Sequence, residues 1–275
     1  MEDLTSKRSA LLQSLAALPG CAVAFSGGVD SAVVAKAARI ALGDRALAVT
    51  GVSASLANGE LDQATELAGA IGIRHVIVTT DEFDSNEYVR NAPDRCYHCK
   101  TELYSQMLRR LGEWGQPTIV NGANADDAND YRPGMQAAAE NQIRSPLAEC
   151  GITKAEVRQL AADWGLSVWD KPATPCLSSR VAYGEAVTPE RLQMIDRGEQ
   201  FLRQLGFCSL RVRYHAGDLA RIEVAASDLP RVCDLDFRRQ LVAHFKQLGF
   251  KFITVDLEGF RSGSLNQLVS IRPNT

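Results

Sequence analysis

The sequence predicts an α/β protein in which a larger domain with a parallel β-sheet precedes a smaller α+β domain. Over the first 80 residues, short apolar runs alternate with helical patterns, which is the order of a parallel sheet covered by helices. A stretch without periodicity lies near residue 170, and the strands predicted beyond it alternate apolar and polar residues. A chain of 275 residues can bury two hydrophobic cores.

The larger domain begins with a helical pattern in residues 1–20 and continues with alternating strands and helices. We predict strands over 21–25, 45–52, 75–79 and 118–120, and helices over 29–42, 59–71 and 100–111. Residues 81–99 are rich in charge, and we expect them to be irregular. Thr153 and Glu156 have the spacing of a capping box, which predicts one more helix that ends at Gly165.

We expect the parallel-sheet domain to span residues 1–170, a boundary loop residues 171–187, and the α+β domain residues 188–275. Prolines and glycines without periodicity mark the boundary loop. Thr188 and Pro189 then provide an N-cap and a first-turn proline for a helix that ends at Gly206. The rest of this domain is predicted as strands near 210–214, 221–224 and 252–257, with a helix over 237–248.

The composition is that of a globular protein, with 45% hydrophobic residues, 23% charged residues and a formal net charge of -3. No apolar run approaches the roughly 18 residues of a membrane-spanning helix, and the N-terminus lacks the pattern of a signal peptide. We therefore expect a cytoplasmic protein without a membrane partner. Because the net charge is slightly negative, a small anionic substrate fits better than a nucleic acid.

A loop rich in serine and glycine connects the first predicted strand to the helix that follows it. It contains Ser26, Gly27, Gly28, Asp30 and Ser31. Glycines let the backbone approach an anion, and the N-terminus of the helix favours negative charge. A carboxylate at Asp30 can hold the Mg²⁺ that accompanies phosphates. The loop is thus a predicted phosphate-binding site, although a tight turn whose serine caps the helix would show a similar pattern. A Walker motif is absent from the sequence.

A second polar loop, residues 121–127, follows the strand predicted at 118–120. Because the carboxyl ends of parallel strands meet at one edge of a sheet, we expect Gly122 and Asp126 to form the second wall of the nucleotide site. On its own, this segment would be interpreted as an Asn-rich turn.

The loop at 26–31 resembles the PP-loop of the ATP pyrophosphatases, which include GMP synthetase, NAD synthetase and tRNA thiolation enzymes. The resemblance implies that ATP is cleaved between its α and β phosphates. It also implies adenylation of a carbonyl or carboxylate oxygen, with release of pyrophosphate. The larger domain would accordingly be a PP-loop domain.

Three of the seven cysteines lie in motifs. Cys96 and Cys99 form a C-x-x-C, and Cys176 lies in the boundary loop. A C-x-x-C is typical of half a zinc site, half an iron–sulfur site or a redox pair, and unrelated buried thiols are the plainer alternative. A second C-x-x-C or an H-x-x-x-H that would complete a zinc site is absent from the sequence. We interpret the other four as packing residues: Cys21, Cys150, Cys208 and Cys233.

A closer resemblance covers nearly the whole chain and rests on residues 26–31, 121–127, 172–180, 210–215, 221–224 and 259–266. Together these segments resemble the LarE family of ATP-dependent sulfur transferases, which act in nickel-pincer cofactor biosynthesis. The resemblance implies adenylation of pyridinium-3,5-biscarboxylic acid mononucleotide and conversion of its carboxylates to thiocarboxylates.

The LarE resemblance leaves two sulfur donors open. In one subtype the cysteine that corresponds to Cys176 gives up its own sulfur. In the other, a C-x-x-C joins that cysteine to hold a [4Fe-4S] cluster, and the presence of Cys96 and Cys99 implies this subtype. Rival interpretations are a tRNA thiolation enzyme, an ammonia-using synthetase, and a nucleotide-binding sensor that releases no pyrophosphate.

Two arginines alternate with apolar residues in the strand predicted near 210–214. Arg211 and Arg213 should therefore lie on one face, where guanidinium groups can bind phosphate, although a solvated strand face gives the same pattern. The LarE resemblance implies a substrate site with both arginines and with Ser179, Arg180 and Glu223. The roles of Glu199 and Arg261 stay open, and residues 261–264 are either an anion nest or a surface turn.

We expect a homo-oligomer in which residues 188–275 contribute to substrate binding and assembly.

Overall fold

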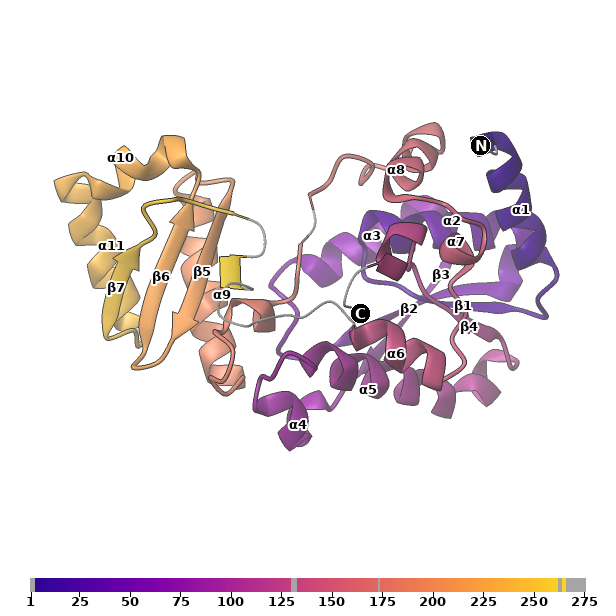
Figure 1. Ribbon diagram of the computed structural model, residues 1–275, viewed down its shortest axis with the longest axis horizontal. Helices are drawn as coiled ribbons and strands as arrows, with labels where there is room; N and C mark the ends of the chain where they lie inside the picture. Colours follow the sequence, from indigo (N-terminus) through magenta and orange to yellow (C-terminus); the bar gives the residue numbers. More distant parts are fainter. Residues whose placement is uncertain (1–2, 130–132, 173, 262–263, 266–275) are drawn as a thin grey trace.

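Two β-sheets, each with its own helices, are seen in a computed structural model that describes residues 3–129, 133–172, 174–261 and 264–265 (Figure 1). The larger sheet is built from the first half of the chain and the smaller sheet from the last third. This confirms the predicted fold class, a parallel-sheet α/β domain followed by a smaller α+β domain. The domain boundaries at 170 and 187 stay predictions.

The larger sheet consists of parallel strands in the order β3-β2-β1-β4. Its strands are β1 (Cys21–Ala24), β2 (Ala46–Val52), β3 (Arg74–Thr79) and β4 (Thr118–Val120). Residues of β1 are buried on both faces, because Cys21 and Val23 pack into one hydrophobic cluster while Ala22 and Ala24 pack into another. A strand covered on both sides explains the continuous apolar runs of the sequence.

Helices cover both faces of this sheet. On the face of Val23 pack α1 (Leu4–Ala16), α2 (Val29–Leu42), α3 (Glu60–Ile71), α7 (Pro146–Glu149) and α8 (Lys154–Asp163). On the other face pack α5 (Arg95–Arg109) and α6 (Pro133–Glu140). The capping box is confirmed at the start of α8, where the Thr153 side chain accepts from the Glu156 backbone.

The segment 81–99 is more regular than the sequence predicts. It contains a short 3₁₀ turn, η2 (Glu82–Asp84), a helix α4 (Asn86–Val89), and the first turn of α5, which begins at Arg95 and not at Lys100. The expectation of an irregular, charged excursion was therefore wrong. Charge did not prevent helix formation, because Tyr88 and Arg95 are buried against the boundary loop.

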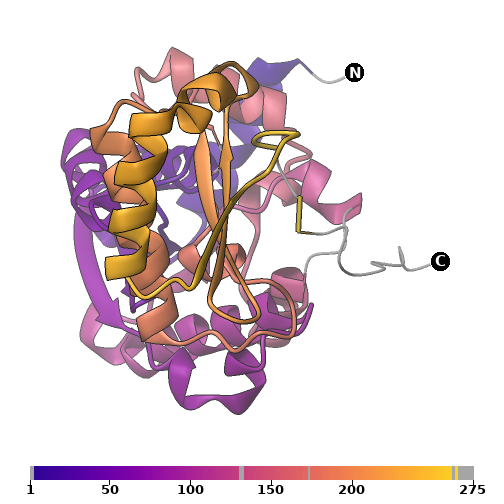
Figure 2. The same ribbon diagram turned by 90° about the vertical axis from the view of Figure 1, so that its left-hand side faces the viewer.

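The smaller sheet consists of β5 (Leu210–His215), β6 (Leu219–Val224) and β7 (Phe252–Val255). Strands β5 and β6 are antiparallel, and β7 runs parallel to β6. The helices α9 (Pro189–Gln204), α10 (Leu229–Cys233) and α11 (Leu235–Gln247) lie beside these strands (Figure 2). Thr188 accepts from Arg191 N and caps α9 as predicted, with Pro189 in the first turn. Apolar side chains of α9, β5 and α11 share one core.

The boundary loop returns to the larger domain and is bonded to it. Leu177 N donates to Ser55 O at 3.0 Å, Tyr88 Oη and Ser178 Oγ are 2.7 Å apart, and Val187 N donates to Val89 O at 2.9 Å. The loop therefore lies against both the segment after β2 and the α4–α5 segment. Among the residues that the structure describes, no helix has the length and apolar character of a membrane span.

Candidate active site

The Ser26–Ser31 loop lies between β1 and α2, as the sequence predicts. Gly27 has a φ of 72°, and a Cβ placed there would come within 3.2 Å of the Ala64 Cβ on α3. Gly28 precedes the first residue of α2, and Ser31 Oγ donates to Gly28 O at 3.0 Å. The loop is thus folded tightly over the N-terminus of α2, the end of a helix that favours anions.

The second polar loop is in direct contact with the first. A Cβ on Gly122 would lie 2.8 Å from the backbone nitrogen of Ser31, so only glycine allows the two loops to approach this closely. Asn124 Nδ2 donates to Asp30 Oδ1 at 3.1 Å, which joins the loops through a side chain as well. The structure brings together the two walls that the sequence analysis expected.

A lysine that the sequence analysis did not select completes this cluster. Lys154 Nζ forms an ion pair with Asp30 Oδ2, and Lys154 N donates to Asp126 Oδ2 at 2.8 Å. Lys154 is the first residue of α8, directly after its cap Thr153. The capping box was the available signal, since it marks where a helix N-terminus begins. A cation therefore lies beside the carboxylate predicted to hold Mg²⁺.

The three motif cysteines influence one another electrostatically, although they come from distant segments. Cys96 and Cys99 lie in the first turns of α5, and Cys176 directly precedes the 3₁₀ turn η5 (Leu177–Arg180). Burial, Cys176 and Cys96 raise the pKa of Cys99 to about 12. Burial and Cys176 also raise the pKa of Cys96, which Arg95 and Lys100 lower. These mutual effects mean that the three sulfur atoms are near one another.

Buried hydrogen bonds fix the Cys176 loop beside α5. Arg95 Nη1 donates to Ser178 O at 2.9 Å, and Asn91 Nδ2 donates to Ala182 O at 2.8 Å. From the other side, Arg180 Nη1 donates to Cys176 O at 2.8 Å and to Pro175 O. Arg180 is fully buried. The loop is therefore held by the segment before and at the start of α5 on one side and by Arg180 on the other. Ser179 Oγ donates to Cys176 O at 2.7 Å.

The thiols remain accessible from solvent, because Cys96 is exposed and Cys99 and Cys176 are half-buried. Within the described part of the chain, no group of three or more His, Cys, Asp or Glu side chains could hold a single metal ion. The thiols thus meet in one region without forming the compact ligand shell of one ion.

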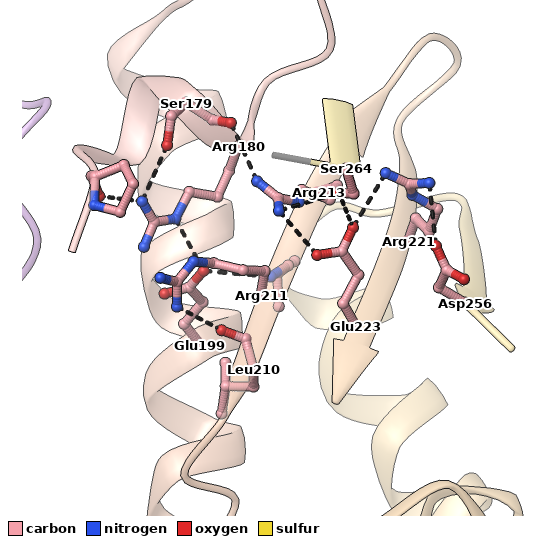
Figure 3. A network of polar contacts seen from close by, with 12 residues as sticks. Ser179, Arg180, Glu199, Leu210, Arg211, Arg213, Arg221, Glu223, Asp256 and Ser264 are labelled. Atoms are coloured by element: carbon pink, nitrogen blue, oxygen red, sulfur yellow. Dashed lines mark hydrogen bonds and ion pairs between the residues drawn. The ribbon is translucent and has the colours of Figure 1, made fainter. Parts of the chain in front are cut away.

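Two buried glutamates form ion pairs with four of the arginines beside the small sheet (Figure 3). Glu223 accepts from Arg213 at 2.8 Å, from Arg221 at 3.1 Å and from Ser264 Oγ at 2.6 Å. Glu199, on α9, accepts from Arg180 at 3.1 Å and from Arg203 at 2.7 Å. Glu199 therefore supports Arg180, which answers part of the question left open for it.

Arg211 differs from its neighbours, because no carboxylate lies within ion-pair distance of it among the described residues. Its Nη1 donates to Leu210 O at 2.7 Å, and its guanidinium lies 5.0 Å from the centre of the Phe260 ring. Burial together with the charges of Arg180 and Arg213 lowers the pKa of Arg211 to about 10. This excess of positive charge favours a bound anion.

Helix α3 contacts the predicted ATP loop and carries a carboxylate that Arg180 influences. Ala64 contacts Gly27, and Glu60 lies one turn earlier on the same helix. Burial raises the pKa of Glu60, while the charges of Arg180 and Lys171 lower it.

Arg261 forms an ion pair with Glu258, and residues 262–263 of the predicted anion nest lie outside the described residues. The roles predicted for the individual site residues stay predictions.

Comparison with known proteins places this geometry in context. The chain is 45% identical over 267 residues to an uncharacterized Synechocystis protein, slr1717, covering 97% of this chain and 99% of that one. It is 37% identical over 272 residues to the pyridinium-3,5-bisthiocarboxylic acid mononucleotide synthase of Lactiplantibacillus plantarum, covering 98% and 97%. A tRNA-specific 2-thiouridylase of Rickettsia rickettsii is 27% identical over 188 residues, covering 54% and 51%. No protein-family model matches.

Proposed function

Because this chain belongs to the LarE family, with 37% identity over nearly its full length to a pyridinium-3,5-bisthiocarboxylic acid mononucleotide synthase, we propose that it performs that reaction. It is an ATP-dependent sulfurtransferase that converts the carboxylates of pyridinium-3,5-biscarboxylic acid mononucleotide to thiocarboxylates in nickel-pincer cofactor biosynthesis. The proposal is supported by the contact between the two predicted nucleotide loops, by three thiols that influence one another's pKa, and by the excess positive charge at Arg211.

ATP binds with its phosphates over Ser26, Gly27, Gly28 and Ser31, at the N-terminus of α2. Mg²⁺ is usually held by one or two carboxylates and by the phosphates themselves, so Asp30 suffices as its protein ligand. With Mg²⁺ held at Asp30, Lys154 would be free to bind the phosphates. A substrate carboxylate then attacks the α-phosphate, which leaves an acyl adenylate and pyrophosphate.

Sulfur comes from a [4Fe-4S] cluster held by Cys96, Cys99 and Cys176 in our proposal. Thiolates are the ligands of such clusters, and the three thiols influence one another without forming the ligand shell of a single ion, which is compatible with this group. When bound, the cluster would supply hydrosulfide at an iron without a protein ligand. Arg95 and Lys100 offset the negative charge of the thiolates. The alternative is that Cys176 gives up its own sulfur.

The substrate phosphate binds at Arg211, with Arg213 and Ser179 beside it. Arg180 and Glu223 act mainly by holding this surface, because both are buried and paired. We further propose that the second domain assembles into a homo-oligomer, since Phe252 in the edge strand β7 and Leu257 just beyond it expose 61% and 80% of their surface.

Pyrophosphate release tests the function directly. Protein purified without oxygen and incubated with ATP, Mg²⁺ and the mononucleotide should release pyrophosphate and AMP, and mass spectrometry should find sulfur in place of oxygen in the substrate. Omission of the mononucleotide is the control. Release of pyrophosphate with tRNA, and not with the mononucleotide, would favour the thiouridylase activity named for the Rickettsia relative.

Arg211→Met and Arg213→Met should have different consequences. Either change should weaken mononucleotide binding by about 1.5 to 3 kcal/mol, as expected for a lost charge-assisted hydrogen bond, and leave ATP affinity nearly unchanged. Arg213→Met should also lower the free energy of unfolding by about 1 to 3 kcal/mol because it removes a partner of buried Glu223. Arg211→Met removes no such partner. Calorimetry measures the affinity for the mononucleotide and for ATP, and urea unfolding measures the free energy of unfolding. An equal loss of ATP affinity would show that the arginines belong to the nucleotide pocket.

A further inference from the structure

A buried glutamate that the sequence analysis did not select, Glu82, has one carboxylate oxygen without a hydrogen-bond partner among the described residues. Glu82 is in the turn η2, just after β3, and only 2% of its surface is exposed. Its Oε1 accepts from Ser53 Oγ at 2.5 Å and from Ser55 Oγ at 3.1 Å. Both serines follow β2, the strand beside β1. Glu82 therefore lies at the edge of the sheet from which the ATP loop also leaves.

The second oxygen of Glu82 is buried and has no hydrogen-bond partner among the residues that the structure describes. A buried acceptor without a donor costs about 1 to 3 kcal/mol, so nearly all such atoms in proteins have a partner. Within the described residues, no hydrogen bond joins Glu82 to a cysteine, so the oxygen is not occupied by a neighbouring thiol either. Oε2 is thus available to a donor that comes with a ligand.

Glu82 is also close to the sulfur site. The pKa of Cys99 is raised mainly by burial and by Cys176, and the carboxylate of Glu82 adds to that increase. Ser55, which donates to Glu82, accepts the backbone N–H of Leu177, the residue after Cys176. One chain of contacts therefore runs from Glu82 to the loop that carries the third thiol.

A purely structural role would explain only one of the two carboxylate oxygens of Glu82. Holding Ser53 and Ser55 requires one acceptor oxygen, and glutamine provides one. The carboxylate supplies a second oxygen, which has no partner in the described part of the chain. A role in the reaction accounts for this atom.

Building on the proposed function, we propose that Glu82 is the proton acceptor of the sulfur-transfer step. Hydrosulfide attacks the carbonyl carbon of the acyl adenylate and forms a C–S bond. The bond between that carbon and the AMP oxygen breaks, and AMP leaves with the electron pair. The proton on sulfur passes to Glu82 Oε2, so the product is a thiocarboxylate anion. No oxidation or reduction takes place, and the protonated Glu82 returns its proton to solvent.

Separate measurement of the two half-reactions tests this role. In iron-loaded protein supplied with ATP, Mg²⁺, the mononucleotide and sodium sulfide, Glu82→Gln should release pyrophosphate within about twofold of the wild-type rate. It should form thiocarboxylate on the order of 100-fold more slowly, the usual contribution of a general base. Glu82→Asp should recover part of the loss, because it restores the carboxylate. Glu87→Gln, the same change at an exposed position on α4, should have no effect.

Two outcomes would overturn the proposal. Thiocarboxylate formation at the wild-type rate in Glu82→Gln would show that no proton passes to this residue. Loss of pyrophosphate release, bound iron or thermal stability in the same variant, without recovery in Glu82→Asp, would show that Glu82 only supports the fold. Failure of the proposed function itself is recognised separately, because wild-type protein would then release no pyrophosphate with the mononucleotide.

Discussion

Asp30→Ala should reduce pyrophosphate release on the order of 100-fold or more, the usual cost of removing a charge-stabilising group from an active site. The carboxylate lies at the N-terminus of α2 and is bonded to Asn124 and Lys154. Its loss removes the proposed anchor of Mg²⁺ and leaves Lys154 without its partner. A phosphate-release assay coupled to pyrophosphatase measures the effect with saturating ATP.

The matched control is Asp44→Ala, because the Asp44 side chain is fully exposed and pairs with Arg39 on the surface. It should leave turnover unchanged. Lys154→Met should weaken ATP binding and spare the Mg²⁺ dependence, which separates the lysine from the metal ligand. Undiminished turnover of Asp30→Ala would show that this residue is not part of the ATP site.

The strands of the larger sheet could be predicted because of how they are buried. Residues 21–25 form a continuous apolar run, and the structure packs alternate side chains of this run into two different clusters. Such a run between helical patterns indicates a central parallel strand. The contact between the two polar loops, 26–31 and 121–127, followed from the same reasoning, since both loops leave the carboxyl edge of neighbouring strands.

Contacts between distant segments could not be predicted in the same way. Helix α5 begins at Arg95 because the buried guanidinium meets Ser178, which is 83 residues later in the sequence. The partner of Glu223 was equally hidden, since Arg211 lies directly opposite it across the strands, yet the close ion pair forms with Arg213. Lys154 reaches Asp30 from a helix that starts 124 residues later. Local patterns carry no information on such pairs.

Serine at position 96, 99 or 176 should each remove the proposed cluster, with loss of its visible absorption and of bound iron from protein purified without oxygen. The three thiols influence one another's charge, and the loop with Cys176 is fixed by Arg95 and Arg180. A serine hydroxyl is a poor iron ligand, and the two thiols that remain would hold a cluster too weakly. Multiple-turnover sulfur transfer should fall with the iron in all three variants.

Cys150→Ser provides the control for these variants, because Cys150 packs against the core of the larger domain and belongs to no motif. It should keep both iron and activity. The two sulfur donors differ in what they leave behind, since a cluster supplied with sulfide can act repeatedly, whereas a donated cysteine sulfur is spent after one turnover. If protein purified without oxygen contains no iron, and Cys176 alone loses the mass of H₂S after one turnover, then Cys176 itself is the donor. In that case Cys96→Ser and Cys99→Ser would retain the single turnover, and the convergence of the three thiols would need another explanation.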